Sequence, residues 1–291
     1  MQIKQHTFNT GTTTINIAEG PATGLPLLLL HGGSNRWQSF QTIIPDLAPH
    51  YHLYLLDFRG HGQSGRTPGQ YRLQDYTDDT IALLRQHVQK PVLIFGHSMG
   101  GIVTLLVASQ QPQLVKAVVI GDSPLTAKTW HTVLEQSRDG LIHWRNLAGG
   151  DTPIEELITG LKESPTRLPG QNQPVRLADV LGEDSPAFAY IAHDLYQNDP
   201  AMLTALLDDF DAIAAGYEME RVLPAIRCPV LLLQADPASG GLMTDEEVEQ
   251  ALTLLEKPSH VRLEGIGHVL HMHSQQKEPV LEAIVNFFNG A

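Results

Sequence analysis

The chain has 291 residues, of which 42% are hydrophobic and 18% charged, so it can bury a packed core and is not expected to be disordered. Its formal net charge is −13 with only 19 lysines and arginines, which argues against nucleic acid and anionic membrane surfaces as partners. The single cysteine, Cys228, precludes an intrachain disulfide and precedes an apolar run, so we interpret it as a small buried hydrophobic side chain. The first residues lack a signal-peptide core, and no apolar run approaches the ~18 residues that span a bilayer, so a cytoplasmic location is expected.

Short apolar runs predict the strands of a sheet. Most of them lack strict alternation, which is typical of strands buried on both faces in a parallel sheet. These runs are residues 15–17, 27–30, 52–56, 92–95, 117–120, 230–233 and 261–263. Residues 2–8 alternate instead and are expected to form an antiparallel edge strand, joined to the next by a turn at residues 9–11.

Helical patterns separate these runs. They cover residues 73–88, 99–110, a stretch that opens at Thr244, and 279–288. Residues 99–110 are apolar on most sides and predict a buried helix, while the acids after Thr244 suit a helix N-terminus. Strands that alternate with helices predict an α/β fold with a doubly wound sheet and right-handed crossovers.

The alternation stops between residues 123 and 223. Helical patterns dominate there, at residues 130–144, 153–162, 187–196 and 201–215, and no strand pattern is present. We interpret this stretch as a helical cap inserted into a core formed by residues 1–122 and 224–291.

The most specific motif is GHSMG at residues 96–100, which fits G-x-S-x-G. A predicted strand precedes it and a predicted buried helix follows it, which is the context that the motif requires. Gly96 and Gly100 leave room for a tight turn that lifts the hydroxyl of Ser98 above the sheet. The backbone N–H of Met99 then points to the place where an oxyanion forms, so Ser98 is the candidate nucleophile.

Two earlier strands also end in glycine-rich turns. HGG at residues 31–33 follows the run 27–30, and the N–H of Gly33 is placed to be a second oxyanion donor. Residues 57–64, DFRGHGQS, follow the next strand. We interpret this second segment as structural, linking loops beside the pocket.

His268 ends the segment GIGH that follows the last predicted strand. A loop histidine at this place can meet Ser98 over the edge of the sheet, take its proton as general base and donate it to the leaving group. The chain has 14 histidines, so position is what selects this one. His271 and His273 are the competing candidates.

Together these segments resemble the α/β-hydrolase superfamily, in particular its capped branch of small esterases, C–C bond hydrolases, dehalogenases and epoxide hydrolases. The resemblance covers roughly residues 1–122 and 224–291. It implies the α/β-hydrolase fold, a mostly parallel doubly wound sheet with an inserted helical cap, and an oxyanion hole at Gly33 and Met99. Dehalogenases and epoxide hydrolases of the family use an aspartate nucleophile, so Ser98 argues against both reactions.

Two aspartates satisfy the expected chain order of serine, acid and histidine. Asp236 follows the run 230–233 and Asp122 follows the run 117–120. Relatives usually take the acid from the later strand, although this turn is shorter than their G-x-x-D pattern, and a minority use the earlier one. We favour Asp236 and expect the other acid to bind loop N–H groups.

The leading hypothesis is a serine hydrolase that cleaves a carboxylic ester or related acyl bond through an acyl-enzyme. C–C bond hydrolysis of a β-diketone-like substrate uses the same triad and is an alternative. A non-catalytic ligand receptor on the same fold is another, because fold alone does not decide function.

A small-molecule ester or acyl substrate is the expected partner, and the chain is expected to be a monomer or homodimer. No motif implies a metal or an organic cofactor. Trp37 is a candidate pocket wall. More of the cap aromatic residues are expected to pack than to line the pocket, and these are Trp130, Trp144, Phe188, Tyr190, Tyr196, Phe210 and Tyr217.

Overall fold

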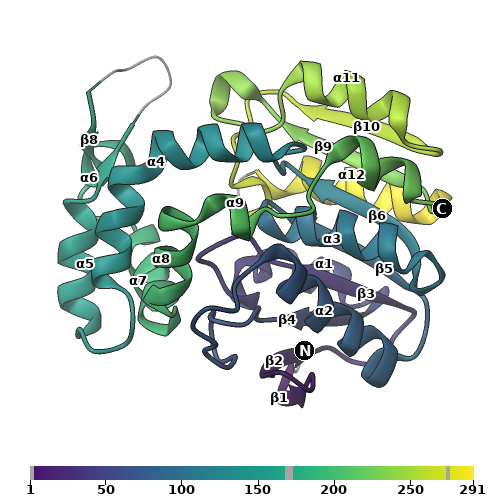
Figure 1. Ribbon diagram of the computed structural model, residues 1–291, viewed down its shortest axis with the longest axis horizontal. Coiled ribbons are helices and arrows are strands. Elements are labelled where there is room, and N and C mark those ends of the chain that lie inside the picture. Colours follow the sequence, from purple (N-terminus) through teal and green to yellow (C-terminus); the bar gives the residue numbers. More distant parts are fainter. Residues whose placement is uncertain (1–2, 168–172, 273–275) are drawn as a thin grey trace.

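The computed structural model describes residues 3–167, 173–272 and 276–291 (Figure 1). Its centre is an eight-stranded sheet in the order β1-β2-β4-β3-β5-β6-β9-β10. Every pair from β4 to β10 is parallel, whereas β2 runs antiparallel to both β1 and β4. The strands are β1 (Lys4–Asn9), β2 (Thr14–Glu19), β3 (Leu25–Leu30), β4 (Tyr51–Leu56), β5 (Val92–His97), β6 (Val115–Gly121), β9 (Val230–Ala235) and β10 (Pro258–Leu263).

The strand predictions are confirmed because each apolar run lies within one of these strands. Alternate residues of a strand point to opposite faces, so each buried strand feeds two cores. In β3, Leu28 and Leu30 join one hydrophobic cluster, while Leu27 and Leu29 join the other. The mostly parallel sheet with a helical layer on each face is the predicted doubly wound α/β architecture.

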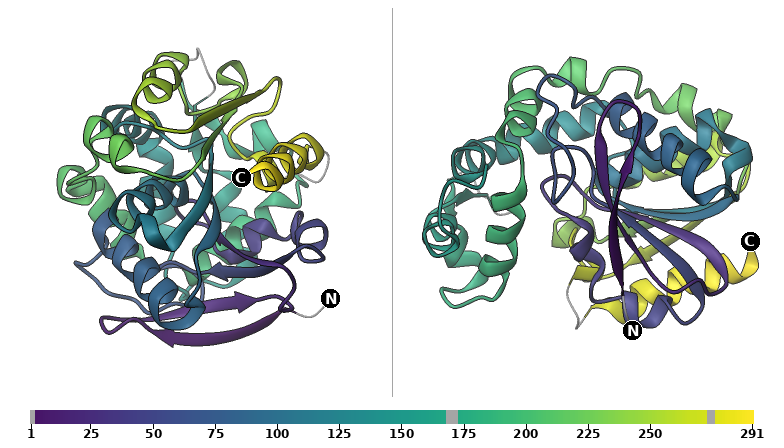
Figure 2. Two further views of the ribbon diagram at one scale, coloured as in Figure 1. Left: turned by 90° about the vertical axis from the view of Figure 1, so that its right-hand side faces the viewer. Right: turned by 90° about the horizontal axis from the view of Figure 1, so that it is seen from below.

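Helices cover both faces of the sheet (Figure 2). On one face lie α2 (Leu73–Leu83), α3 (Met99–Gln110), α10 (Met219–Val222) and α11 (Asp245–Leu254), and on the other lie α1 (Ile44–Leu47) and α12 (Lys277–Gly290). The predicted helix at 73–88 ends in a π-helical turn, η2 (Leu84–Val88). Thr244 caps α11 as expected, because its hydroxyl accepts a hydrogen bond from the N–H of Glu247.

A helical segment, here called the cap segment, connects β6 to β9 (Figure 1). Its elements are α4 (Ala127–Leu147), α5 (Ile154–Lys162), β7 (Pro165–Thr166), β8 (Val175–Arg176), α6 (Leu177–Leu181), α7 (Ala187–Gln197), α8 (Pro200–Asp208), α9 (Phe210–Ile213) and α10. The two-residue strands β7 and β8 depart from the expectation of helices alone. The predicted helix at 201–215 is divided because Asp209 has a non-helical backbone, with φ −144° and ψ 55°.

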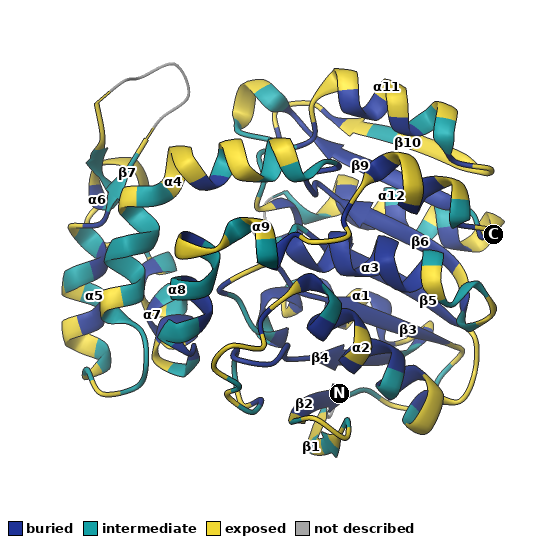
Figure 3. Ribbon diagram, in the orientation of Figure 1, coloured by how far each residue is buried: buried dark blue, intermediate teal, exposed yellow. Residues whose placement is uncertain are grey.

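The cap segment has a small core of its own. Leu157 and Leu161 of α5 pack with Phe188 and Leu195 of α7 in a cluster separate from the two that flank the sheet. The cap segment is less buried than the sheet: the central strands and α3 are buried, whereas the cap helices carry many exposed residues (Figure 3). Within the described ranges, no helix combines the length and apolarity that a membrane crossing requires.

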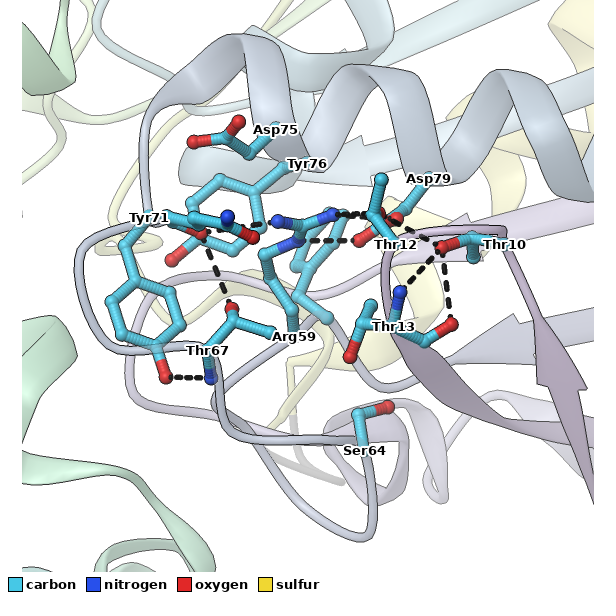
Figure 4. A network of polar contacts seen from close by, with 12 residues as sticks. Thr10, Thr12, Thr13, Arg59, Ser64, Thr67, Tyr71, Asp75, Tyr76 and Asp79 are labelled. Atoms are coloured by element: carbon cyan, nitrogen blue, oxygen red, sulfur yellow. Dashed lines mark hydrogen bonds and ion pairs between the residues drawn. The ribbon is translucent and has the colours of Figure 1, made fainter.

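The segment at residues 57–64 links several loops, as its structural interpretation predicts (Figure 4). The guanidinium of buried Arg59 donates to both carboxylate oxygens of Asp79 on α2, at 2.7 and 2.8 Å, and to the hydroxyl of Thr12 in the β1–β2 turn. The carboxylate of Asp57 accepts from the backbone N–H groups of Trp37 and Gln63. These bonds tie the loop after β4 to its neighbours beside the candidate site.

Candidate active site

Ser98 occupies the sharp turn between β5 and α3. Its φ of 55° and ψ of −123° lie in a region that L-residues rarely adopt, as expected of a strained nucleophile elbow. The turn tolerates no side chain at two flanking positions. A Cβ on Gly96 would lie 2.3 Å from the carbonyl oxygen of Gly100, and a Cβ on Gly100 would lie 2.2 Å from the carbonyl oxygen of Leu30. The predicted need for glycine at both positions is therefore met.

Three side chains from distant parts of the chain form one hydrogen-bonded row. Nε2 of His268 lies 3.2 Å from Oγ of Ser98, and Nδ1 of His268 lies 2.7 Å from Oδ2 of Asp122. A carboxylate only accepts, so Nδ1 carries the proton and Nε2 presents its lone pair to the serine hydroxyl. The arrangement has the geometry of a nucleophile, a general base and an orienting acid.

Asp122 is fully buried directly after β6, with a positive φ of 39°. Besides His268, its carboxylate accepts hydrogen bonds from the backbone N–H groups of Leu242 and Met243 and of Ala235. Burial by itself would raise the pKa of Asp122, but the hydrogen bond from His268 and those from the backbone outweigh it and lower the pKa. The acid is thus held ionised beside the imidazole.

The preference for Asp236 as the partner of His268 is wrong. Asp236 follows β9, but its carboxylate accepts from the N–H group of Ala238 in its own turn and from that of Gly265 in the loop after β10, each at 3.0 Å. These bonds lower the pKa of Asp236. The shortened turn caps the 3₁₀ helix η5 (Pro237–Ser239) instead of projecting the acid toward the imidazole. Asp236 is therefore the loop acid that the alternative predicted.

The competing histidines do not replace His268 in this row. His271 is fully buried, with its ring stacked on Phe40 at a centroid distance of 4.7 Å. Burial lowers its pKa well below the ordinary value, so it stays neutral. His273 lies outside the described residues.

The predicted oxyanion donors lie beside the serine. Gly33 and Met99 both line the cavity that contains Ser98, and Met99 is the first residue of α3. Within the described parts of the chain, the N–H groups of these two residues donate to no backbone carbonyl outside regular elements. A Cβ on Gly32 would lie 3.6 Å from Oγ of Ser98, which shows how closely this loop approaches the hydroxyl. Both N–H groups are free to serve an oxyanion.

Buried polar residues that the sequence analysis missed support this site. Nε2 of His97 donates to the carbonyl oxygen of His268 at 2.7 Å and so holds His268 through its backbone. His61 accepts the N–H of Ser34 through Nε2 at 3.2 Å, while Nδ2 of Asn198 donates to the carbonyl oxygen of Ser34 at 2.9 Å. The loop after Gly33 is therefore held from both sides, by the core and by the cap segment.

Burial keeps the supporting histidines neutral. It lowers the pKa of His61 and of His97 to about 3, and a neighbouring histidine adds to the effect in each case. Burial likewise lowers the pKa of His31 to about 4, and Nε2 of this ring accepts the N–H of Phe58. A neutral imidazole has one donor and one acceptor nitrogen, which is what the bonds of His61 and His31 require. The glycine-rich turns that carry them were visible in the sequence, but their partners were not.

A cavity of about 330 Å³ lies above Ser98, between the sheet and the cap segment. Trp130, Leu134 and Leu141 of α4 form part of its wall, together with Met202 of α8 and the core residue Tyr76. Within the described residues, no Lys, Arg, Asp or Glu lines it. The cavity therefore offers an apolar environment with few polar groups besides the row at Ser98.

Two expectations about the wall have different outcomes. Trp37 does not line this cavity: it is buried against the second core, and its indole N–H donates to Gln5. Of the seven aromatic residues of the cap segment, Trp130 and Trp144 line the cavity and the other five do not. Most of these residues therefore pack, as predicted. Cys228 is buried as well, and burial raises the pKa of its thiol to about 11.

Comparison with known proteins agrees with this architecture. The alpha/beta hydrolase fold family matches residues 26–272. A segment of 97 residues is 36% identical to (E)-2-((N-methylformamido)methylene)succinate hydrolase of Acinetobacter baylyi, covering 33% of this chain and 37% of that protein. The chain spans about two-fifths of the length of the first curated relatives it matches.

Two solved structures share the fold over nearly the whole chain. E-2-(acetamidomethylene)succinate hydrolase superposes with a TM-score of 0.73 at 19% identity, covering 99% of this chain and all of that one. A thermophilic esterase from Thermogutta terrifontis superposes with a TM-score of 0.71 at 21% identity, covering 100% of this chain and 99% of that one. With a family match over most of its length, the chain belongs to the alpha/beta hydrolase fold family.

Proposed function

We propose that this protein is a serine hydrolase that cleaves carboxylic esters of uncharged, apolar substrates through an acyl-enzyme. The observation that carries the proposal is the hydrogen-bonded row of Ser98, His268 and Asp122, which opens onto an apolar cavity. Relatives named as hydrolases and an esterase of the same fold are consistent with it.

The proposal gives each group a role that its geometry supports. His268 takes the proton of the Ser98 hydroxyl through Nε2 as Oγ attacks the ester carbonyl carbon. Asp122 keeps the proton on Nδ1 and stabilises the imidazolium that forms. The charged carbonyl oxygen accepts from the N–H groups of Gly33 and Met99. The imidazolium then protonates the leaving alcohol. Water attacks the acyl carbon as His268 takes its proton, the bond to Oγ of Ser98 breaks, and the imidazolium returns the proton to Oγ as the carboxylic acid leaves.

The substrate class follows from the charges around the cavity. A carboxylate in the substrate would find no lysine or arginine among the described lining residues. The residues outside the described ranges contain none either. Because burying an unpaired carboxylate is costly, dicarboxylate substrates such as the succinates named for two relatives are disfavoured here.

The two alternatives gain less support. A C–C hydrolase needs groups that polarise a second carbonyl, and the described lining contains no lysine, arginine, asparagine or glutamine for this task. A receptor needs no aligned base, whereas Nε2 of His268 lies within hydrogen-bond distance of Ser98.

A substrate series tests the proposal. We expect steady turnover of p-nitrophenyl esters with unbranched acyl chains, and at least tenfold lower kcat/KM for the p-nitrophenyl hemiester of succinate than for the butyrate ester. Ser98→Ala is expected to lose about 10³-fold or more in kcat, because the triad members act as a unit. If the wild-type protein turned over no ester, or the variant kept most of its activity, the proposal would be wrong.

A further inference from the structure

Four polar side chains meet at the β1 edge of the sheet, away from the candidate active site. His6 lies on β1, Glu19 ends β2, His52 lies on β4 and His87 lies in η2. In the sheet, β4 and β3 separate β2 from β5, which leads to Ser98. The four side chains are partly buried, with exposed fractions between 18% and 36%. None of these residues belongs to the motifs that define the active site.

Three of these side chains direct one donor atom each toward a shared point. Oε2 of Glu19 lies 3.7 Å from Nε2 of His6 and 3.4 Å from Nε2 of His87. All three donor atoms lie within 4.8 Å of one another. Metal–nitrogen and metal–oxygen bonds near 2.1 Å in a tetrahedron place neighbouring ligand atoms about 3.4 Å apart. Small side-chain movements would therefore bring the three atoms to coordination distance.

Nε2 of His6 gives independent support. This atom is inaccessible to solvent and has no hydrogen-bond partner among the described residues. A polar atom buried without a partner is costly, and an ion bound between the three donors would remove that cost.

His52 orients the carboxylate of Glu19, and Tyr54 in turn holds the ring of His52. Nε2 of His52 lies 2.7 Å from Oε1 of Glu19, whereas Oε2 is the oxygen nearest to His6 and His87. Nδ1 of the same ring lies 3.2 Å from the hydroxyl of Tyr54. His52 can therefore donate to Glu19 while accepting from Tyr54, which leaves Oε2 of Glu19 for an ion. Histidine–carboxylate pairs of this kind fix metal ligands in known sites.

We propose that His6, Glu19 and His87 bind one divalent transition-metal ion of the zinc class. Two imidazole nitrogens favour such an ion over magnesium or calcium, which prefer oxygen ligands. A surface hollow of about 520 Å³, lined in part by Lys4, His6, Glu19 and His52, gives water access to a fourth position. The ion would tie the β1–β2 hairpin to the end of the helix at residues 73–88. This ion stabilises the sheet edge and takes no part in ester hydrolysis. The proposal departs from the sequence analysis, which found no motif that implies a metal.

Metal titration of tag-free protein at pH 7.5 tests this site. We expect one Zn²⁺ per chain by calorimetry, a rise of several degrees in melting temperature at saturation, and visible absorption of bound Co²⁺ typical of tetrahedral nitrogen and oxygen ligands. His6→Gln and His87→Gln are expected to weaken Zn²⁺ binding by more than 100-fold, and His52→Gln by about 10- to 100-fold. His50→Gln, which alters an exposed histidine directly before β4, is the matched control and should bind as the wild type does.

The Co²⁺ spectrum of the wild-type protein keeps the test independent of variant folding. Absence of that spectrum, or Zn²⁺ binding that is the same in His6→Gln, His87→Gln and wild type, would overturn the proposal. Ester hydrolysis after stripping with a chelator should be unchanged, so a failure of the metal site is distinguishable from a failure of the proposed reaction. Loss of hydrolysis on stripping that Zn²⁺ restores would place the metal in catalysis and contradict the structural role.

Discussion

Oδ2 of Asp122 and Nδ1 of His268 are separated by 146 positions in the sequence and by 2.7 Å in the structure. The strand order explains why this acid reaches the imidazole. Asp122 directly follows β6, which pairs with β9, and its N–H donates to the carbonyl oxygen of Leu233. The chain turns there with a positive φ, and the carboxylate of Asp122 lies within hydrogen-bond distance of the imidazole of His268. An acid also follows β9, but the carboxylate of Asp236 accepts from the N–H groups of its own turn and of the loop after β10.

Exchanging each aspartate for asparagine separates their roles. Asp122→Asn removes the charge that fixes the tautomer of His268, so we expect kcat to fall by about 10²- to 10⁴-fold with little change in KM. Asp236→Asn is expected to lower kcat by less than about tenfold and to act through loop stability. Steady-state kinetics on p-nitrophenyl esters, with melting temperatures for both variants, measure this. A severe kinetic defect in Asp236→Asn alone would contradict the assignment.

A fluorophosphonate probe tests the nucleophile directly. The reagent needs a serine activated by a base, so we expect one label per chain, located on Ser98 by peptide mass spectrometry. Ser137 lines the same cavity and is a matched control. Labelling should be lost in Ser98→Ala and retained in Ser137→Ala. A label on another serine, or no label on folded wild-type protein, would argue for a receptor.

The sequence predicted the sheet and the elbow because their determinants are local. Buried strands are recognisable as apolar runs, and the turn around Ser98 requires glycine two positions before and two positions after the serine. The position of His268 after the last strand is equally local information. These features depend on residues that are neighbours in the chain, so a pattern of residue types is enough to find them.

The partners of these residues were less predictable because they depend on three-dimensional contacts. Asp122 and Asp236 each follow a strand in a suitable turn, and only the direction of the carboxylate separates them. Asn198 shows no motif, yet its amide reaches Ser34 across 164 positions. His6 and His87 likewise look unremarkable in the sequence and come together only because the sheet edge and η2 are adjacent.

Asn198 connects the cap segment to the loop that contains Gly33 and Ser34. Removing its side chain should therefore affect the transition state more than substrate binding. Its Nδ2 donates to the carbonyl oxygen of Ser34, next to Gly33. Asn198→Ala removes this bond, and we expect kcat to fall on the order of tenfold with less than a twofold change in KM, since a hydrogen bond is worth about 1 kcal/mol. Asn286→Ala, which alters an exposed asparagine on α12, should leave both constants unchanged. A defect confined to KM would show that Asn198 serves substrate binding instead.

The buried histidines predict that the fold loses stability in mild acid. His31, His61 and His97 have pKa values lowered by burial to about 4, 3 and 3, against an ordinary value of 6.5. Below pH 6.5 the unfolded chain therefore binds more protons at these sites than the folded chain does. The free energy of unfolding falls as the pH drops from 6.5 toward 4, and these groups contribute no slope above 6.5. Asp194, whose pKa burial raises to about 7, acts in the opposite direction.

His61→Gln isolates one of these contributions, because an amide oxygen can still accept the N–H of Ser34. The variant lacks the titrating group. Between pH 6.5 and 5, the slope of its unfolding free energy against pH should therefore be smaller than that of the wild type by up to about 1.4 kcal/mol per pH unit. Between pH 8 and pH 5, the unfolding free energy of the wild type should fall by about 2 kcal/mol more than that of the variant. Urea unfolding at pH 5, 6.5 and 8 measures this, with exposed His50→Gln as the control whose profile stays parallel to wild type. If the His61→Gln profile also ran parallel to the wild type, His61 would titrate alike in the folded and unfolded chain, and it would not be the neutral acceptor that holds the loop after Gly33.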